Sequence, residues 1–225
     1  MTLHPSQQYW GSIDYLFNKY DFLNIWTING YPVLMVFWNL FLLLIPFFIV
    51  KILLLYYLAN NFGKFRQKLV AFFLFFLWIL FFPNSAYIIN DVRNLSGYCS
   101  AIYYGNVCVE NAWMIVFFFI YAILGWMAFV FLLNQMRNFI TKAKSRGLAN
   151  FFVVIIIPIT SLGVLLGLIN RFNSWEIFIK PWEIINSALV YFTDFYYFKD
   201  FLIFTIAFYI LYFIGNRLFR FNDYL

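Results

Sequence analysis

The sequence predicts an all-α integral membrane protein with about five transmembrane helices, and three observations lead to this fold class. Hydrophobic residues make up 65% of the 225 residues and charged residues 11%, whereas soluble domains contain about 45–50% and about 25%. Five apolar segments are long enough to cross a bilayer, which takes about 20 helical residues. Basic residues gather in alternate loops, which predicts an orientation in the membrane. We therefore expect a single polytopic membrane domain over residues 1–225.

The five predicted spans cover approximately residues 31–59, 68–87, 112–134, 151–169 and 201–219. The loops after the first and third spans and the C-terminal tail, together with the span ends beside them, carry nine of the 15 basic residues but only one acid, Asp223. Because Lys and Arg in short loops face the cytoplasm, we predict a multi-pass cell-membrane protein with its N-terminus outside and its C-terminus in the cytoplasm. The same basic residues flank membrane spans and can meet anionic headgroups, so we expect membrane lipids as partners and no nucleic acid.

Two further segments are predicted to be helical without crossing the bilayer. Residues 1–30 are interrupted by charged residues but repeat apolar residues with helical spacing, which favours an outer interfacial helix or a lid on the bundle. Residues 181–198 begin with Pro181, a favoured first helical position. The apolar part of this second segment is too short to span, so we expect an interfacial or re-entrant helix.

The second span runs into a polar stretch, Asn84–Asp91, directly after Pro83. Proline disfavours helix at the preceding residue, so we predict that the span kinks or breaks at Phe82 and restarts. Asn84 and Tyr87 would then face protein at the outer leaflet. The alternative is a proline kink followed by ordinary interfacial polar residues.

The fourth span contains Gly163 and Gly167, a spacing that lets two helices approach closely. Close packing inside the bundle and packing between two copies both explain the pair. Beyond the span, Asn173 and Glu176 are spaced as a helix start in which Asn173 caps and Glu176 reaches back. That capping interpretation leaves Arg171 and Trp175 without a structural explanation.

Three polar features from different spans are predicted to lie at similar depth: Asn39, the stretch from Asn84 to Asp91, and the stretch from Asn170 to Glu176. Polar groups near the hydrocarbon are costly, so a cluster of them predicts a functional site. We expect an outward-facing pocket in which Arg171 recognises carboxylate or phosphate. Asp91 and Glu176 would pair with it, act as acid and base or hold a divalent cation. A purely structural salt bridge to Arg171 is the alternative.

These residues resemble the three signature stretches of a bacterial membrane-protein family known as domain of unknown function 1361. The stretches are Trp38–Phe41 with Ile45 and Pro46, Phe82–Asp91, and Arg171–Glu176. The resemblance covers nearly all of the chain and implies a small polytopic bacterial protein without an assigned activity. It also implies that Pro83 matches a family position and that Glu176 replaces an aspartate. The family often has His where this chain has Asn94 and Arg where it has Leu168. These departures argue against a histidine-dependent mechanism and against a second arginine in the pocket.

The sequence therefore supplies two sets of candidate site residues. The candidate catalytic residues are Asp91, Arg171 and Glu176. The candidate substrate-binding residues are Asn39, Asn84, Tyr87, Asp91, Arg171, Asn173, Ser174 and Trp175. We expect no metal and no cofactor, because His4 is the only histidine and it matches no zinc pattern with Cys99 and Cys108. The two cysteines are equally compatible with a disulfide and with free thiols.

Three functions fit these observations. The favoured one is binding or modifying an amphiphilic anionic envelope substrate, such as a lipid headgroup or a lipid-linked glycan, with enzymatic activity left open. The first alternative is a non-catalytic assembly or scaffold subunit that uses its glycines and aromatic surface against another membrane protein or a second copy. The second alternative is a small transporter component, for which no inverted repeat is visible.

Overall fold

The predicted all-α membrane fold is confirmed, since five of the described helices are long and apolar enough to cross a membrane. The computed structural model describes residues 27–28, 31–60, 63–94 and 113–219. The predictions for His4, for most of the N-terminal interfacial segment and for Cys99 and Cys108 lie outside these residues.

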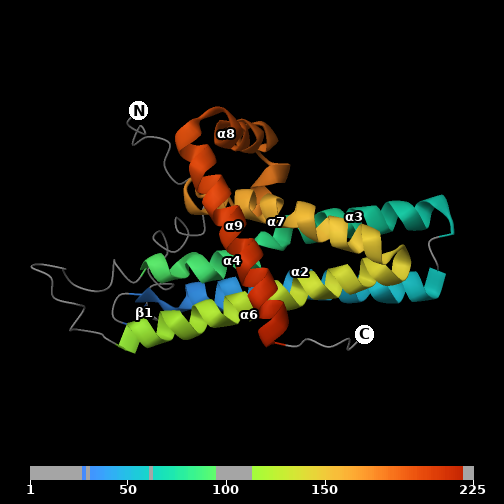
Figure 1. Cartoon of the computed structure of the whole chain (residues 1–225), viewed down its shortest axis with the longest axis horizontal. Coiled ribbons are helices and arrows are strands. Elements are labelled where there is room, and N and C mark those ends of the chain that lie inside the picture. The colour runs from blue at the N-terminus through green and yellow to red at the C-terminus, as the bar shows by residue number, and fades with distance from the viewer. Residues whose placement is uncertain (1–26, 29–30, 61–62, 95–112, 220–225) are drawn as a thin grey trace, which may run out of the picture.

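The elements follow one another as short strands and mostly long helices. They are β1 (Thr27–Ile28), β2 (Tyr31–Pro32), α2 (Val33–Asn60), α3 (Phe65–Phe81), α4 (Pro83–Asn90), the 3-10 turn η2 (Asp91–Asn94), α6 (Trp113–Ala143), α7 (Arg146–Leu168), the 3-10 turn η3 (Ser174–Phe178), α8 (Pro181–Thr193) and α9 (Phe195–Leu218). The two strands pair antiparallel directly before the first span. Figure 1 shows α2, α3, α4, α6 and α7 running along the long axis, whereas α9 starts beside α8 and runs across them.

The second span consists of two helices, α3 and α4, which meet at the predicted break. The Phe82 N–H still donates to the Trp78 carbonyl at 2.8 Å, so the hydrogen-bond ladder of α3 continues to that residue. Pro83 has no N–H and interrupts the ladder. The hydroxyl of Ser85 donates to the Phe82 carbonyl at 2.7 Å, and its N–H donates to the same oxygen at 3.0 Å. Ser85 therefore helps to satisfy the backbone where α4 restarts.

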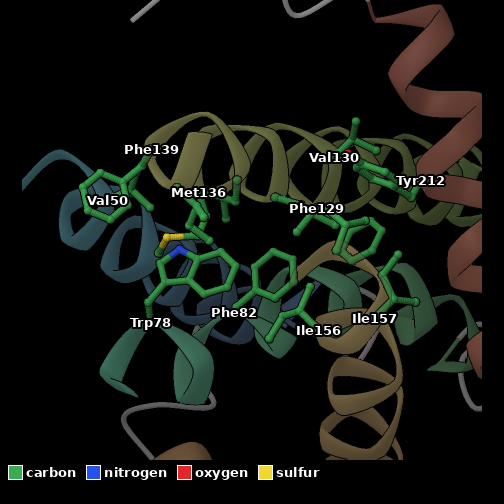
Figure 2. Close-up of a cluster of buried hydrophobic side chains, with 14 of the residues drawn as sticks. Val50, Trp78, Phe82, Phe129, Val130, Met136, Phe139, Ile156, Ile157 and Tyr212 are labelled. Atoms are coloured by element: carbon green, nitrogen blue, oxygen red, sulfur yellow. The ribbon is translucent and has the colours of Figure 1, made fainter. Parts of the chain in front are cut away.

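A buried aromatic stack lies at the centre of the bundle, where α3, α6 and α7 meet (Figure 2). Trp78 and Phe82 stack with their ring centroids 4.3 Å apart, and Phe82 stacks on Phe129 at 5.5 Å. All three side chains are fully buried. Ile156 and Ile157 of α7 pack on the same cluster. Each span also exposes several large apolar side chains, as expected of helices that face lipid.

Helix α4 packs against α6 and α7 at three glycines. A methyl group at Gly125 would lie 2.8 Å from the Ile88 side chain and 3.2 Å from a backbone nitrogen of α4. A methyl group at Gly163 would lie 2.9 Å from Pro83, and one at Gly167 would lie 3.4 Å from the Tyr87 ring. The glycine pair of α7 therefore allows close packing inside the chain.

Helix α9 is attached to α6 by buried polar contacts. The amide of Asn134 donates to the Asn216 side chain at 2.9 Å and accepts from the Tyr212 hydroxyl at 2.9 Å. The indole of Trp126 donates to the Leu211 carbonyl at 2.8 Å. These bonds satisfy polar groups in a region of high apolar content, where an unpaired group is costly.

Three helices end or begin at other residues than the predicted segments. The second span begins at Phe65, and the third helix continues to Ala143 as α6. The predicted helix over residues 181–198 divides at Asp194, whose carboxylate accepts the Tyr196 N–H at 2.8 Å and caps α9. Residues 195–198 therefore belong to the last span. Hydrophobicity alone does not predict where these helices begin and end, because polar side chains continue or restart a helix through capping and hydrogen bonding.

We expect Gly125→Ala to destabilise the protein, because the added methyl group meets the backbone of α4 and cannot be accommodated by a rotamer change. Overpacking of this kind costs about 1–3 kcal/mol. The measurement is the thermal unfolding temperature of purified protein in detergent. Gly147→Ala is the matched control, since a methyl group there meets nothing within 4 Å. Equal unfolding temperatures for the two variants would contradict the tight contact between α4 and α6.

Candidate functional site

The sequence-predicted site residues lie at one end of the bundle. In Figure 1, α2 and α6 begin at this end, and α4 and α7 finish there. It is the end that the distribution of basic residues predicts to face outward. Polar contacts from α2, α4, η2, α7 and η3 meet here, as the following pairs show.

Asn39 and Asp91 form a partly buried contact between α2 and the end of α4. The Asn39 amide donates to a carboxylate oxygen of Asp91 at 2.9 Å, across 52 residues of chain. The Asp91 side chain is 3% exposed and stands at the C-terminal end of α4. The first span and the end of the second are therefore joined, as the sequence predicted.

The third polar stretch contacts the first two through η3. The Asn84 amide donates to the Ser174 hydroxyl at 3.2 Å, which joins the start of α4 to η3. Trp175 meets Trp38 of α2 edge-to-face, with ring centroids 6.2 Å apart. Asn84, Ser174 and Trp175 thus come together with Trp38, the neighbour of Asn39, from α4, η3 and α2.

Glu176 and Asn173 form the predicted helix start. The Glu176 carboxylate accepts the Asn173 N–H at 2.6 Å and the amide of the same side chain at 3.3 Å. Both bonds use the same oxygen of Glu176. This carboxylate therefore has a structural role at the beginning of η3. Asp91 is the more buried of the two candidate acids.

Arg171 adopts a backbone conformation that is unusual for its residue type. Its φ is 61°, and the side chain is exposed just beyond the end of α7. The Phe172 N–H returns to the Leu166 carbonyl at 3.3 Å, which closes the helix end. Helices commonly end with a residue in this left-handed conformation, but that residue is usually glycine. An arginine here costs about 1–2 kcal/mol relative to an ordinary conformation.

Tyr191 joins α8 to the residue before Arg171. Its hydroxyl donates to the Asn170 side chain at 3.2 Å and to the Leu165 carbonyl at 3.4 Å. Burial raises the pKa of Tyr191 to about 12, with smaller contributions from Tyr197 and Asp200. The hydroxyl therefore stays protonated and remains a donor.

Two further residues belong to this end of the bundle although the sequence did not single them out. Arg93 of η2 donates to the Leu168 carbonyl at 3.0 Å and so contacts the C-terminal end of α7. Tyr121 of α6 is 3% exposed and lies near Asp91, Asn39 and Tyr87. The sequence does give a signal for Arg93, which is a basic residue in a predicted outward segment where the other charged residues are mainly acidic. Tyr121 gives no such signal, because it lies in an apolar span.

The contacts form two groups. Asn39, Asp91 and Tyr121 make up a buried group, which we call the Asp91 cluster. Asn84 with η3, and Arg171 beside it, make up a more exposed group. Arg93 connects η2 to the end of α7 between them. The described residues hold no set of three or more His, Cys, Asp or Glu side chains suited to a metal ion.

We expect Asn39→Ala to lower the free energy of unfolding by about 1–3 kcal/mol, because the buried Asp91 carboxylate loses a donor. Thermal unfolding of purified protein measures this change. Asn90→Ala is a matched control, since the Asn90 amide donates only to the Ala86 carbonyl of its own helix, at 3.1 Å. An equal loss of unfolding free energy in both variants would show that the bond from Asn39 to Asp91 stabilises the protein no more than the bond from Asn90 within α4.

A comparison with protein families agrees with the sequence motifs. The model of the family described as "Protein of unknown function (DUF1361)" matches residues 38–214, which is more than half of the chain. The matched range includes every candidate site residue. No curated protein and no solved structure gives a significant match.

Proposed function

The chain belongs to the DUF1361 family, whose description names no reaction. We propose that this protein binds an amphiphilic anionic molecule of the cell envelope. The ligand would be a lipid headgroup or a lipid-linked glycan, bound at the outer end of the bundle. Arg171 would contact its anionic group. Binding is the common first step whether the protein then modifies the molecule or passes it on.

The observation that carries this proposal is the placement of Arg171. Its guanidinium is exposed, and its backbone has a φ of 61°. Glycine would close the end of α7 at a lower conformational cost, so the helix end does not explain an arginine. Residues held in costly conformations occur preferentially at functional sites. A guanidinium offers a planar set of donors that matches phosphate or carboxylate.

Helix α8, which contacts the residue before Arg171 through Tyr191, has an apolar face that suits a ligand with an apolar part. Helix α8 exposes Trp182, Ile185, Leu189 and Phe192, which recur at the three- and four-residue spacing of one helix face. Tryptophan and other aromatic residues favour the level of the lipid headgroups. A ligand held by Arg171 would therefore have its acyl chains beside an apolar surface, as an interfacial helix provides.

The scaffold alternative has less support from the packing. Gly163 and Gly167 are the residues that it would use against a partner helix, and both face α4 of the same chain. Their contacts are already made inside the bundle. A scaffold role would therefore depend on other surfaces.

We expect Arg171→Gly to abolish the retention of anionic lipid while leaving the fold intact. The variant loses a charged donor worth about 1.5–3 kcal/mol but relieves the backbone strain. Native mass spectrometry of protein purified from anionic and zwitterionic nanodiscs would measure the bound lipid, with an expected loss of about tenfold or more.

Lys180→Gln is the control, because Lys180 is an exposed cation that pairs with Glu183 at 3.6 Å. It should retain the anionic lipid. If Arg171→Gly keeps its lipid, or if both variants lose it equally, the specific role of Arg171 is wrong.

The proposal requires the candidate site to face outward, which the basic loops predict. In a background without native cysteines, Lys180→Cys should react with a membrane-impermeant maleimide in intact cells. Lys64→Cys and Lys144→Cys, in the loops after the first and third spans, should react only after the membrane is permeabilised. The opposite labelling pattern would reverse the orientation and place Arg171 in the cytoplasm.

A further inference from the structure

An arginine near the inner end of the bundle is held by side chains from two neighbouring helices. The Arg137 guanidinium of α6 donates to the side-chain oxygen of Asn150 in α7, from Nε at 3.2 Å and from Nη2 at 3.0 Å. The Tyr212 hydroxyl of α9 lies beside the same guanidinium. Arg137 is half-buried, and these contacts fix its position where α6, α7 and α9 meet.

Among the described residues, the groups that contact Arg137 do not balance its charge. Asn150 and Tyr212 are neutral, and the Tyr212 hydroxyl donates in turn to the neutral amide of Asn134 at 2.9 Å. The described acids all lie in the outward segments or in the first two turns of α9, and they are Asp91, Glu176, Glu183, Asp194 and Asp200. A charge taken partly out of water is costly unless it is paired. An anion from outside the chain would therefore stabilise Arg137.

The guanidinium also has more N–H groups than its neighbours accept. It carries five N–H groups in a planar fork, whereas Asn150 and Tyr212 each offer one side-chain oxygen. A neutral amide such as glutamine could bond to the same two oxygens, so these contacts alone do not require an arginine. The remaining donors of a guanidinium match the oxygens of a phosphate.

The depth of Arg137 corresponds to the boundary between the hydrocarbon and the headgroups of the inner leaflet. Helix α6 has 31 residues and ends at Ala143, so it is about 46 Å long and Arg137 lies about 9 Å before its inner end. The hydrocarbon core of a bilayer is about 30 Å thick, so both ends of α6 extend beyond it. Phospholipid phosphates lie within reach of a long side chain at this level.

Apolar side chains beside Asn150 offer a surface for acyl chains. Phe151 and Val154 of α7 are 60% and 56% exposed, and Val154 lies one turn from Asn150 on the same helix face, toward the centre of the bilayer. In Figure 1, α6 and α7 extend past the C-terminal end of α9, so α9 does not cover their inner ends. A ligand with a phosphate at Arg137 would therefore place its acyl chains along α7.

We propose that Arg137, Asn150 and Tyr212 form a binding site for the phosphate of an anionic phospholipid in the inner leaflet. This site lies at the opposite end of α7 from Arg171 and does not depend on the outer site. The phosphate would accept from the remaining N–H groups of Arg137, while Asn150 and Tyr212 hold the guanidinium in place. The exposed Lys144, between α6 and α7, would contribute only the general attraction that basic loops have for anionic headgroups.

The test is photo-crosslinking of the full chain in intact nanodiscs, with either phosphatidylglycerol or phosphatidylcholine carrying a photoreactive acyl chain. The lipid is detected in the bilayer because a ligand on the lipid-facing side of the bundle exchanges with its surroundings. Mass spectrometry would measure the labelling of residues 146–155 of α7. We expect phosphatidylglycerol to label this segment about tenfold more than phosphatidylcholine, and Arg137→Gln to remove the difference.

Asn150→Ala should lower the preference several-fold, and it remains informative if Arg137→Gln does not fold, because Asn150 is exposed. Lys144→Gln is the control for general attraction and should keep the preference. Arg171→Gly should also keep it, whatever that variant does to lipid retained at the outer site.

An equal labelling by the two lipids in the unaltered protein would overturn the proposal. A full preference in Arg137→Gln, or an equal loss in Lys144→Gln, would overturn it as well. Removal of the preference by an excess of inorganic phosphate would assign the site to a soluble phosphate compound instead of a lipid.

Discussion

The close packing of α4 between α6 and α7 is the constraint on which the rest of this structure depends. Helix α4 has only eight residues, so it cannot hold its position through length. It approaches its neighbours at Gly125 and Gly163, where a methyl group would meet α4 atoms at 2.8–2.9 Å. Protein interiors transmit such contacts because they are as densely packed as crystals. The absence of side chains at these positions therefore sets where α4 lies.

The position of α4 determines the position of the site. Asp91 and Arg93 follow directly from its last turn, and each contacts a different neighbouring helix. Asn84, in its first turn, contacts η3. One short helix thus places polar groups against α2, against the end of α7 and against η3.

Much of this could be predicted from the sequence, because hydropathy and proline act locally. The existence of the five spans, the break at Pro83 and the cap formed by Glu176 all follow from residues close together in the chain. The boundary at Asp194 was missed because one carboxylate bonding one N–H decides it. Tyr121 was missed because a tyrosine in an apolar span is usually a packing residue. Its place beside Asp91 depends on how α6 packs against η2.

The polar contacts of the site also constrain how the protein is made. Asn39 bonds to a residue 52 positions later, Arg93 to one 75 positions later, and Asn84 to one 90 positions later. During synthesis the chain emerges from its N-terminal end, so the first two spans enter the bilayer before the end of α7 and η3 exist. Polar groups without partners are costly in the hydrocarbon region. The early helices must therefore stay in a protein-lined or hydrated environment until the fourth span arrives.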